Sequence, residues 1–199
     1  MQHIVCVSNM SLILIVHIIL FEIMFFIKSI LLSNKLKISI RGKNKEAITS
    51  IVLFFITISV TILSSIFEKL HNVFYPISFF SNPLFNVIGI CLLVLNILIS
   101  CLALINMKES WRIGVKEEEK TELITTGIFG LSRNPYFLSY IVLFIAYILL
   151  VSNVAVIIFS ILSIISIHKM ILKEELFLES LHGNKYLDYK INVARYFII

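Results

Sequence analysis

The chain has 199 residues, of which 59% are hydrophobic and only 15% are charged, and its mean hydropathy is +0.99. These values argue against a soluble globular protein and predict a membrane protein with several spanning helices. The net charge of +5 is explained below by membrane topology, so it does not indicate a nucleic-acid partner.

Three apolar segments long enough to cross a bilayer occupy residues 12–32, 47–67 and 84–105. The first of them contains Glu22. A carboxylate within a membrane segment is a candidate functional residue, but it can also face the helix bundle and be satisfied there by asparagine or serine neighbours. The sequence leaves both interpretations of Glu22 open.

Two shorter apolar segments follow at residues 136–151 and 154–167, separated by Ser152 and Asn153. The first would be only about 24 Å long as a helix, which is less than the hydrocarbon thickness. We therefore predict a tight helical hairpin with Ser152-Asn153 as its turn. The last helix should continue beyond the membrane and end at Gly183, with a short helix following at 186–191.

The positions of the cationic residues test this topology. Fifteen of the 17 lysines and arginines lie in three segments: between the first two spans, between the third span and Arg133, and in the tail. Five spans with the N-terminus outside would place all three segments on the cytoplasmic face, as the positive-inside rule requires. We also predict that the C-terminus and the ligand pocket lie on the cytoplasmic face.

Residues 121–140 are the most polar stretch between membrane segments, and they include Gly127, Gly130 and Pro135. Irregular backbone near a bilayer is tolerated where protein or a water-filled cavity surrounds it, so this stretch is a candidate site. The predicted hairpin would bring its end, residues 133–137, close to Glu174 and Glu175. Such a set of arginine, amide, aromatic and carboxylate groups suits a small zwitterionic ligand with an aromatic ring.

Two linked motifs here resemble a known family. LITTGIFGLSRNPYF, followed after the hairpin by KEELFLESLHGNKYLDYKINVARYF, resembles the isoprenylcysteine carboxyl methyltransferases and the related phospholipid N-methyltransferases. Those enzymes have a T-x-G-x-[FY]-x-x-x-R-[HN]-P-x-Y element before a hairpin and an E-E-x-x-L element after it. The resemblance covers residues 110–197, and the first three spans match in layout only.

The resemblance implies an enzyme that uses S-adenosylmethionine to methylate a lipidic or prenylated acceptor, with an isoprenylcysteine-like carboxylate as one candidate and with membrane lipids around it. A carboxylate acceptor would need no general base. By position, the residues assigned to the cofactor are Thr121, Glu122, Leu123, Ile124 and Phe129 at the adenosine, Asn134, Pro135, Tyr136 and Phe137 at the methionine end, and Glu174 at polar groups, supported by Glu175. Arg112 and Arg133 are assigned to the substrate, although Arg133 could instead brace the loop through backbone carbonyls.

Three departures from the family pattern bear on the acceptor. Phe137 replaces the tyrosine of R-[HN]-P-x-Y, and His182 stands at the aromatic position before Gly183. Met170 occupies the place of an arginine that is thought to meet the substrate carboxylate in the eukaryotic prenylcysteine enzymes. The prenylcysteine acceptor is therefore the least supported part of the resemblance.

Several alternatives remain at this level. Asn134 and Pro135 fit the N-cap and first position of a helix, with or without a binding role. Trp111 is typical of a membrane-interface anchor, with a substrate-lining role as the alternative. An NADPH-dependent sterol-type reductase, or a non-catalytic membrane scaffold, would also account for the helices and polar loops.

The histidines and cysteines have no metal-ligand spacing, so no metal site is predicted. The predicted fold is all-α and polytopic, with about five membrane helices, a C-terminal helical hairpin and a cytoplasmic cofactor pocket. We divide the chain into an N-terminal three-helix region, residues 1–106, and a methyltransferase-like catalytic region, residues 107–199.

Overall fold

The computed structural model describes residues 2–37, 45–111 and 122–196, with side chains from Asn9 onward. This part of the chain is helical, apart from loops and one isolated β-bridge between Pro76 and Asn153. The long helices are α1 (Gln2–Leu36), α2 (Lys45–Ile66), α4 (Pro83–Asn106), α5 (Pro135–Val151) and α6 (Val154–His182). The short ones are α3 (Glu68–Val73), η1 (Ser78–Ser81), η2 (Gly127–Gly130) and α7 (Asn184–Asn192). The predicted all-α class is confirmed.

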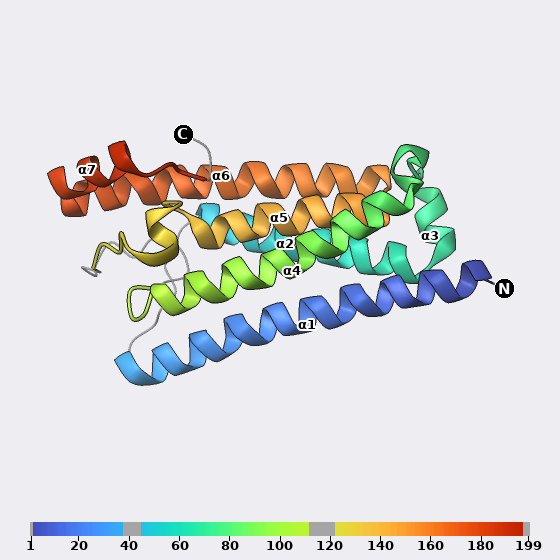
Figure 1. Cartoon of the computed structure of the whole chain (residues 1–199), viewed down its shortest axis with the longest axis horizontal. Coiled ribbons are helices and arrows are strands. Elements are labelled where there is room, and N and C mark those ends of the chain that lie inside the picture. The colour runs from blue at the N-terminus through green and yellow to red at the C-terminus, as the bar shows by residue number, and fades with distance from the viewer. Residues whose placement is uncertain (1, 38–44, 112–121, 197–199) are drawn as a thin grey trace.

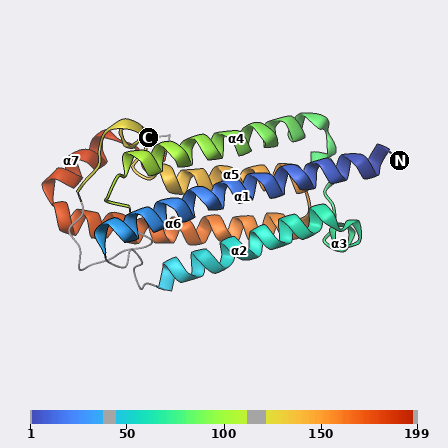
Figure 2. The same ribbon diagram turned by 90° about the horizontal axis from the view of Figure 1, so that it is seen from below.

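The long helices lie side by side along one axis and form an elongated bundle (Figure 1). α4 packs most extensively against α5, and α2 packs against α6, while α5 and α6 form the contact between these pairs. α1 lies along the bundle next to α2 and α4 (Figure 2). Two of the first three long helices, α2 and α4, therefore pack directly against the C-terminal hairpin, while α1 packs mainly against α2 and α4.

The predicted hairpin is present, and its turn uses the expected residues. Ser152 has a φ of +46° in the left-handed region, which ends α5. Asn153 begins α6 as its N-cap, and its Oδ1 accepts a hydrogen bond from the backbone N–H of Val156 at 2.9 Å. At the other end α6 continues as one helix to His182 and stops at Gly183, whose φ is +54°. Glycine has no Cβ to oppose this conformation.

Four of the described helices, α1 (from Asn9), α2, α4 and α6, are long and apolar enough to cross a membrane. α5 is apolar but has only 17 residues, a length of about 26 Å as a helix. Many of the large apolar side chains on these helices point outward and are exposed, including Leu31 at 63% and Ile105 at 62%. This pattern is that of an integral membrane protein, whose apolar outer surface faces lipid. The count of five spans stays a prediction.

Small polar side chains join the helices inside the bundle. The Ser50 and Thr57 hydroxyls of α2 lie 2.9 Å from those of Ser166 and Ser163 on α6. Between α4 and α5, Asn96 donates to the carbonyl oxygen of Ser139 at 2.8 Å. Apolar packing gives little preference for protein over lipid in a bilayer, so such contacts help to specify which helices associate.

The ends of the bundle differ in charge. The end of α1, the start of α2, the end of α4 and the junction of α6 with α7 lie at one end, far from the N-terminus (Figure 1). Lys35, Lys45, Lys108 and Arg133 lie at this end together with the basic residues of α7, whereas Lys69 lies at the other. Five other basic residues on which the topology prediction rests fall outside the described residues: Arg41, Lys43, Arg112, Lys116 and Lys120. Which end faces the cytoplasm stays a prediction.

Candidate functional site

The polar loop before α5 is anchored to the end of α4. Gly127 opens the short helix η2 with a φ of +64°, and the next residue, Ile128, donates its backbone N–H to Asn106 Oδ1 at 3.1 Å. A Cβ built on Gly127 would lie only 1.7 Å from that Asn106 oxygen. The glycine is therefore required both for its backbone conformation and for the close approach of Asn106.

Asn134 and Pro135 stand at the N-cap and first positions of α5, as the sequence predicted. The Asn134 side chain, however, makes no capping hydrogen bond. It reaches across the hairpin and donates its Nδ2 to Glu175 Oε1 on α6 at 2.9 Å. The backbone N–H of Asn134 donates instead to Ser132 Oγ at 3.2 Å. The side chain thus joins the two helices rather than closing one of them.

Glu175 is the centre of a buried charge cluster. Its two carboxylate oxygens accept hydrogen bonds from the guanidinium groups of Arg133 and Arg195, with Arg195 Nη2 at 2.9 Å from Oε2. The side chains of Glu175 and Arg133 are only 5% and 7% exposed. A buried carboxylate is tolerated where charged donors satisfy it, and removal of either partner would leave an uncompensated charge. This cluster fixes the position of α6 relative to the loop before α5.

Arg133 also holds the C-terminal tail. Its Nη1 donates to the carbonyl oxygens of Lys190 and Val193, and its backbone N–H donates to the carbonyl of Ala194 at 2.8 Å. Four of the five guanidinium N–H groups of Arg133 are therefore engaged by protein acceptors. These contacts agree with the alternative interpretation of Arg133, in which it braces the loop through backbone carbonyls.

α7 packs against the same loop. The Tyr189 hydroxyl donates to the carbonyl oxygen of Phe129 at 2.6 Å, and Tyr186 is 1% exposed beside it. Burial raises the pKa of both phenols above the usual value for tyrosine. The short helix thus covers η2 from the side opposite to α4.

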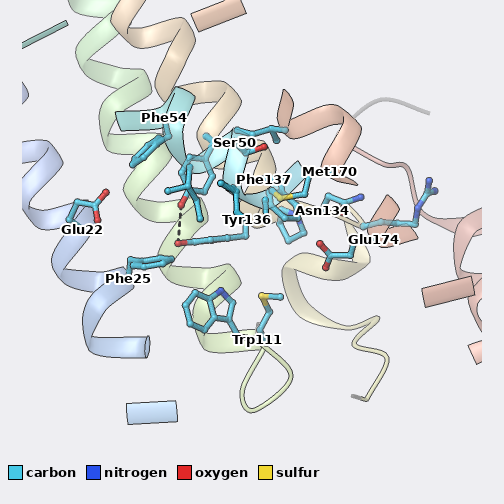
Figure 3. A pocket seen from close by; sticks show the side chains of 18 of the residues that line it. Glu22, Phe25, Ser50, Phe54, Trp111, Asn134, Tyr136, Phe137, Met170 and Glu174 are labelled. Carbon is cyan, nitrogen blue, oxygen red and sulfur yellow. Dashed lines mark hydrogen bonds between the residues drawn. The ribbon is translucent and has the colours of Figure 1, made fainter. Parts of the chain in front are cut away.

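A cavity of about 450 Å³ lies next to this cluster and extends into the bundle (Figure 3). It is within the size range of small-molecule sites and has largely apolar walls with a few polar groups. Its lining residues come from four of the long helices, α1, α2, α5 and α6, and from the segments between helices: Glu22, Phe25, Phe26, Ala47, Ile48, Ser50, Ile51, Phe54, Phe55, Met107, Trp111, Phe129, Arg133, Asn134, Pro135, Tyr136, Phe137, Tyr140, Ile167, Met170 and Glu174.

The cavity has two different ends. Asn134 and Glu174 line it near the charge cluster, whereas Glu22 lines it from α1, on the opposite side of Tyr136 (Figure 3). The walls supplied by α1 and α2 include Phe26 and Ile48, which are themselves 50% and 60% exposed. Because these side chains both line the cavity and lie on the outer surface, the cavity reaches the lipid-facing surface between α1 and α2.

The sequence-predicted residues divide into three groups. Those that line the cavity are Phe129, Arg133, Asn134, Pro135, Tyr136, Phe137 and Glu174. Those described but not lining it are Glu122, which is exposed, the partly buried Leu123 and Ile124, and the buried Glu175. Thr121 and Arg112 lie outside the described residues. Ile124 packs instead against the core cluster that includes Trp111 and Ile128. The cofactor roles assigned to all of these residues stay predictions.

The sequence assigned no residue of the walls from α1 and α2 to the site, and it offered a lining role for Trp111 only as an alternative. Trp111 is 1% exposed and lines the cavity, which contradicts its favoured role as an interface anchor. Its ring packs edge to face with Phe25 at 5.3 Å and with Tyr136 at 6.5 Å between centroids. The only sequence signal for this end was Glu22, a carboxylate in an apolar span.

The groups near Asn134 fit the cofactor that the resemblance implies. The Glu174 carboxylate lines the cavity and makes no hydrogen bond or ion pair with another described residue. Carboxylates accept hydrogen bonds from ammonium and hydroxyl groups, and aromatic and apolar walls suit an adenine ring. Glu174 is therefore available for the polar groups of a ligand, whereas Glu175 is fully used by the protein.

A known protein family and a solved structure are similar to this chain. The phospholipid methyltransferase family matches residues 84–185, about half of the chain. The match begins at the start of α4, before the domain boundary that we predicted at residue 106. A search of curated protein sequences gives no significant match.

Among solved structures, the eukaryotic intramembrane Ras methyltransferase ICMT (isoprenylcysteine carboxyl methyltransferase) has a similar fold. The TM-score is 0.50 at 21% sequence identity, and the alignment covers 75% of this chain and 50% of that one. The chain thus spans half the length of that protein, and at this identity the likeness concerns the fold. Together with the family match, these observations identify the chain as a member of the phospholipid methyltransferase family.

Proposed function

We propose that this chain is an integral membrane methyltransferase that uses S-adenosylmethionine and a lipidic or prenylated acceptor. The observation that carries the proposal is the cavity itself. One end of it is bounded by Asn134 and Glu174, and the other reaches the lipid-facing surface between α1 and α2. A single cavity with a polar end and an opening toward lipid suits a reaction between a polar cofactor and a membrane-embedded acceptor.

The polar end would hold the cofactor, which supplies a methyl group activated on a sulfonium. Glu174 would accept hydrogen bonds from the cofactor, and the backbone and ring of Phe137 with Pro135 would border it. Asn134 is held in place by Glu175 and keeps its Oδ1 available, since no described residue donates to it. Positioning of this kind contributes much of the rate in group transfer.

The acceptor would enter from the bilayer. Phe26, Ile48 and Phe55 line the cavity at the outer surface between α1 and α2, where an apolar chain could pass without exposure to water. Trp111 and Tyr136, both buried, lie between this entrance and the polar end. Exclusion of water by such aromatic walls protects a reactive methyl donor from hydrolysis.

We further propose that the charge-rich end of the bundle faces the cytoplasm and that the N-terminus lies outside. The described lysines and arginines gather at the end that holds Arg133 and α7. This orientation supplies the cofactor from the cytosol. The proposed catalytic region, residues 107–199, would contribute the cofactor end, and the region 1–106 would contribute the acceptor end.

Calorimetric titration of the purified protein in detergent with S-adenosylmethionine and with S-adenosylhomocysteine tests the proposal. We expect binding of both, and at least a tenfold loss of affinity in Glu174→Ala and in Asn134→Ala. The matched control is Glu179→Ala, which removes a partly exposed glutamate that lies on the same helix and pairs with Lys190. Its affinity should equal that of the parent protein.

The same titration separates the rival functions. Binding of NADPH in place of S-adenosylmethionine would favour a reductase. The structure gives a reason to expect otherwise, because Arg133 is the only cation among the described lining residues and its guanidinium is mostly engaged. A parent protein that binds neither ligand would favour a non-catalytic scaffold.

A further inference from the structure

The connection between α2 and α4 is hydrogen-bonded to the turn of the C-terminal hairpin, at the end of the bundle where the N-terminus lies (Figure 1). The backbone N–H of Ile77 donates to the carbonyl oxygen of Ser152 at 2.8 Å. In the other direction, the N–H of Val154 donates to the carbonyl oxygen of Phe74 at 3.0 Å. Between these bonds Tyr75 has a φ of +53°, which is unfavourable for a residue other than glycine. The contacts with the turn therefore hold the connection in a strained conformation.

One side chain from each segment adds a further contact. Asn153 Nδ2, at the turn, lies 3.3 Å from Nδ1 of His71 on α3. The Asn153 amide has a fixed orientation, because its Oδ1 accepts the backbone N–H of Val156 at the start of α6. The amide nitrogen that faces the imidazole can only donate, so His71 must accept through Nδ1. This contact therefore requires a neutral ring with its proton on Nε2.

Protonation of His71 would remove the contact. An imidazolium carries N–H groups on both nitrogens, so its Nδ1 would direct a donor at the donor of Asn153. Turning the amide over would move the same conflict to the N-cap of α6. Asn153 is 0% exposed and has no access to water, whereas His71 is only partly buried and can turn outward. The imidazolium would then leave the turn.

Few charged groups act on His71. Glu68 and Lys69 lie on the same short helix, and Glu68 favours the protonated ring. In the described segments around α3, residues 9–16, 61–67, 72–90 and 149–158, the one titratable side chain is that of Tyr75. Burial outweighs Glu68 and lowers the pKa of His71 below the usual value of about 6.5. The contact is therefore complete above about pH 6.5 and is lost as the pH falls through the lowered pKa.

We propose that His71 and Asn153 form a pH-sensitive latch, which ties the connection between α2 and α4 to the hairpin turn while His71 is neutral and releases it in acid. The latch lies at the opposite end of the bundle from Asn134, and it does not depend on the proposed methyl transfer. With the N-terminus outside, as proposed above, it responds to the pH on the non-cytoplasmic side of the membrane. Its release lets Tyr75 relax and loosens the connection from the hairpin.

Hydrogen–deuterium exchange of the full-length protein in a neutral detergent measures the latch directly. The amides of Ile77 and Val154 report it, because both donate across the junction. Their exchange rates are corrected for the intrinsic effect of pH and compared at pH 8 and pH 5. We expect protection to fall about threefold to tenfold at pH 5, since one supporting hydrogen bond is lost. Equal protection at the two pH values would overturn the latch.

Asn153→Asp should reverse the direction of the pH effect. One carboxylate oxygen can still cap α6, while the other replaces the amide nitrogen that faces His71. A carboxylate binds an imidazolium more strongly than a neutral ring, so protection should be higher at pH 5 than at pH 8. Loss of protection in acid, as in the parent protein, would contradict the proposed arrangement of donor and acceptor.

Two histidine substitutions complete the test. His71→Asn offers an amide oxygen as an acceptor that does not titrate, so protection at Ile77 and Val154 should be the same at both pH values. The matched control is His182→Asn, which removes a histidine at the other end of α6 and should keep the response of the parent protein. An acid loss that persists in His71→Asn would assign the effect to another group and overturn the inference. Circular dichroism at pH 8 checks that each variant is folded.

Discussion

The side-chain amide of Asn134 donates to Glu175 at 2.9 Å, although the two residues are 41 positions apart and stand on different helices of the hairpin. This contact places the residue before α5 directly against the polar end of α6. Glu174, the neighbour of Glu175, then lines the cavity, while Glu175 itself holds Arg133 and Arg195. The two adjacent glutamates therefore differ: Glu174 lines the cavity, whereas Glu175 binds other residues of the protein.

Removal of the Glu175 carboxylate should strongly destabilise the protein. In Glu175→Ala the guanidinium groups of Arg133 and Arg195 lose their shared partner, and a broken buried pair costs about 3–5 kcal/mol. Thermal unfolding in detergent measures the change. Glu179→Ala breaks only the exposed pair with Lys190 and should cost less than about 1 kcal/mol. Equal effects of the two substitutions would contradict the structural role of the cluster.

The loop before α5 should not tolerate a side chain at Gly127. Gly127→Ala places a Cβ against Asn106 Oδ1 and forces an L-residue into a positive φ, so we expect a loss of about 1–3 kcal/mol. Gly130→Ala is the matched control in the same short helix. Its Cβ would meet only the carbonyl oxygen of Thr125 at 3.6 Å, an ordinary contact. A thermal shift of similar size in both variants would argue against this anchoring of the loop.

The polar contacts between α4 and α5 should contribute modestly. Ser139→Ala removes the hydroxyl that accepts from Ser100 Oγ at 2.7 Å, and such contacts between membrane helices are worth about 0.6–2 kcal/mol. The control is Ser180→Ala, an exposed serine whose hydroxyl only bonds back to its own helix. Denaturation in mixed detergent should separate the variants, and a Ser139→Ala protein as stable as Ser180→Ala would contradict the prediction.

Alkaline pH should loosen α7. Burial raises the folded-state pKa of Tyr186 and Tyr189 above the unfolded value of about 10. Above that pH the unfolded chain releases protons that the folded chain retains, so stability is complete below about pH 10 and falls as the pH rises further. Melting temperatures between pH 8 and 11 measure the slope.

Tyr189→Phe provides the internal comparison for the alkaline effect. It loses the hydrogen bond to the Phe129 carbonyl, which should cost about 1 kcal/mol at neutral pH. Because it has one titrating phenol fewer, its stability should fall less steeply above pH 10 than that of the parent protein. An identical slope would show that Tyr189 does not contribute to the alkaline transition.

The sequence by itself determined the helices of this protein. Long apolar segments, the Ser152-Asn153 turn and Gly183 locate α1, α2, α4 and the hairpin because membrane length, turn preference and helix termination are local properties. The two linked motifs also indicated the family and drew attention to Asn134 and Glu174. These residues are close in space because a hairpin must return its second helix to the starting surface.

Only the tertiary structure decided which side chains of different helices contact one another. Three features depend on which faces of the helices meet. Asn134 binds Glu175 instead of capping α5, Trp111 is buried, and Glu22 lines the cavity. In a membrane protein both the lipid-facing and the buried faces of a helix are apolar, so hydrophobic periodicity does not distinguish them. The walls of the cavity that α1 and α2 supply could therefore not be derived from the pattern of residues alone.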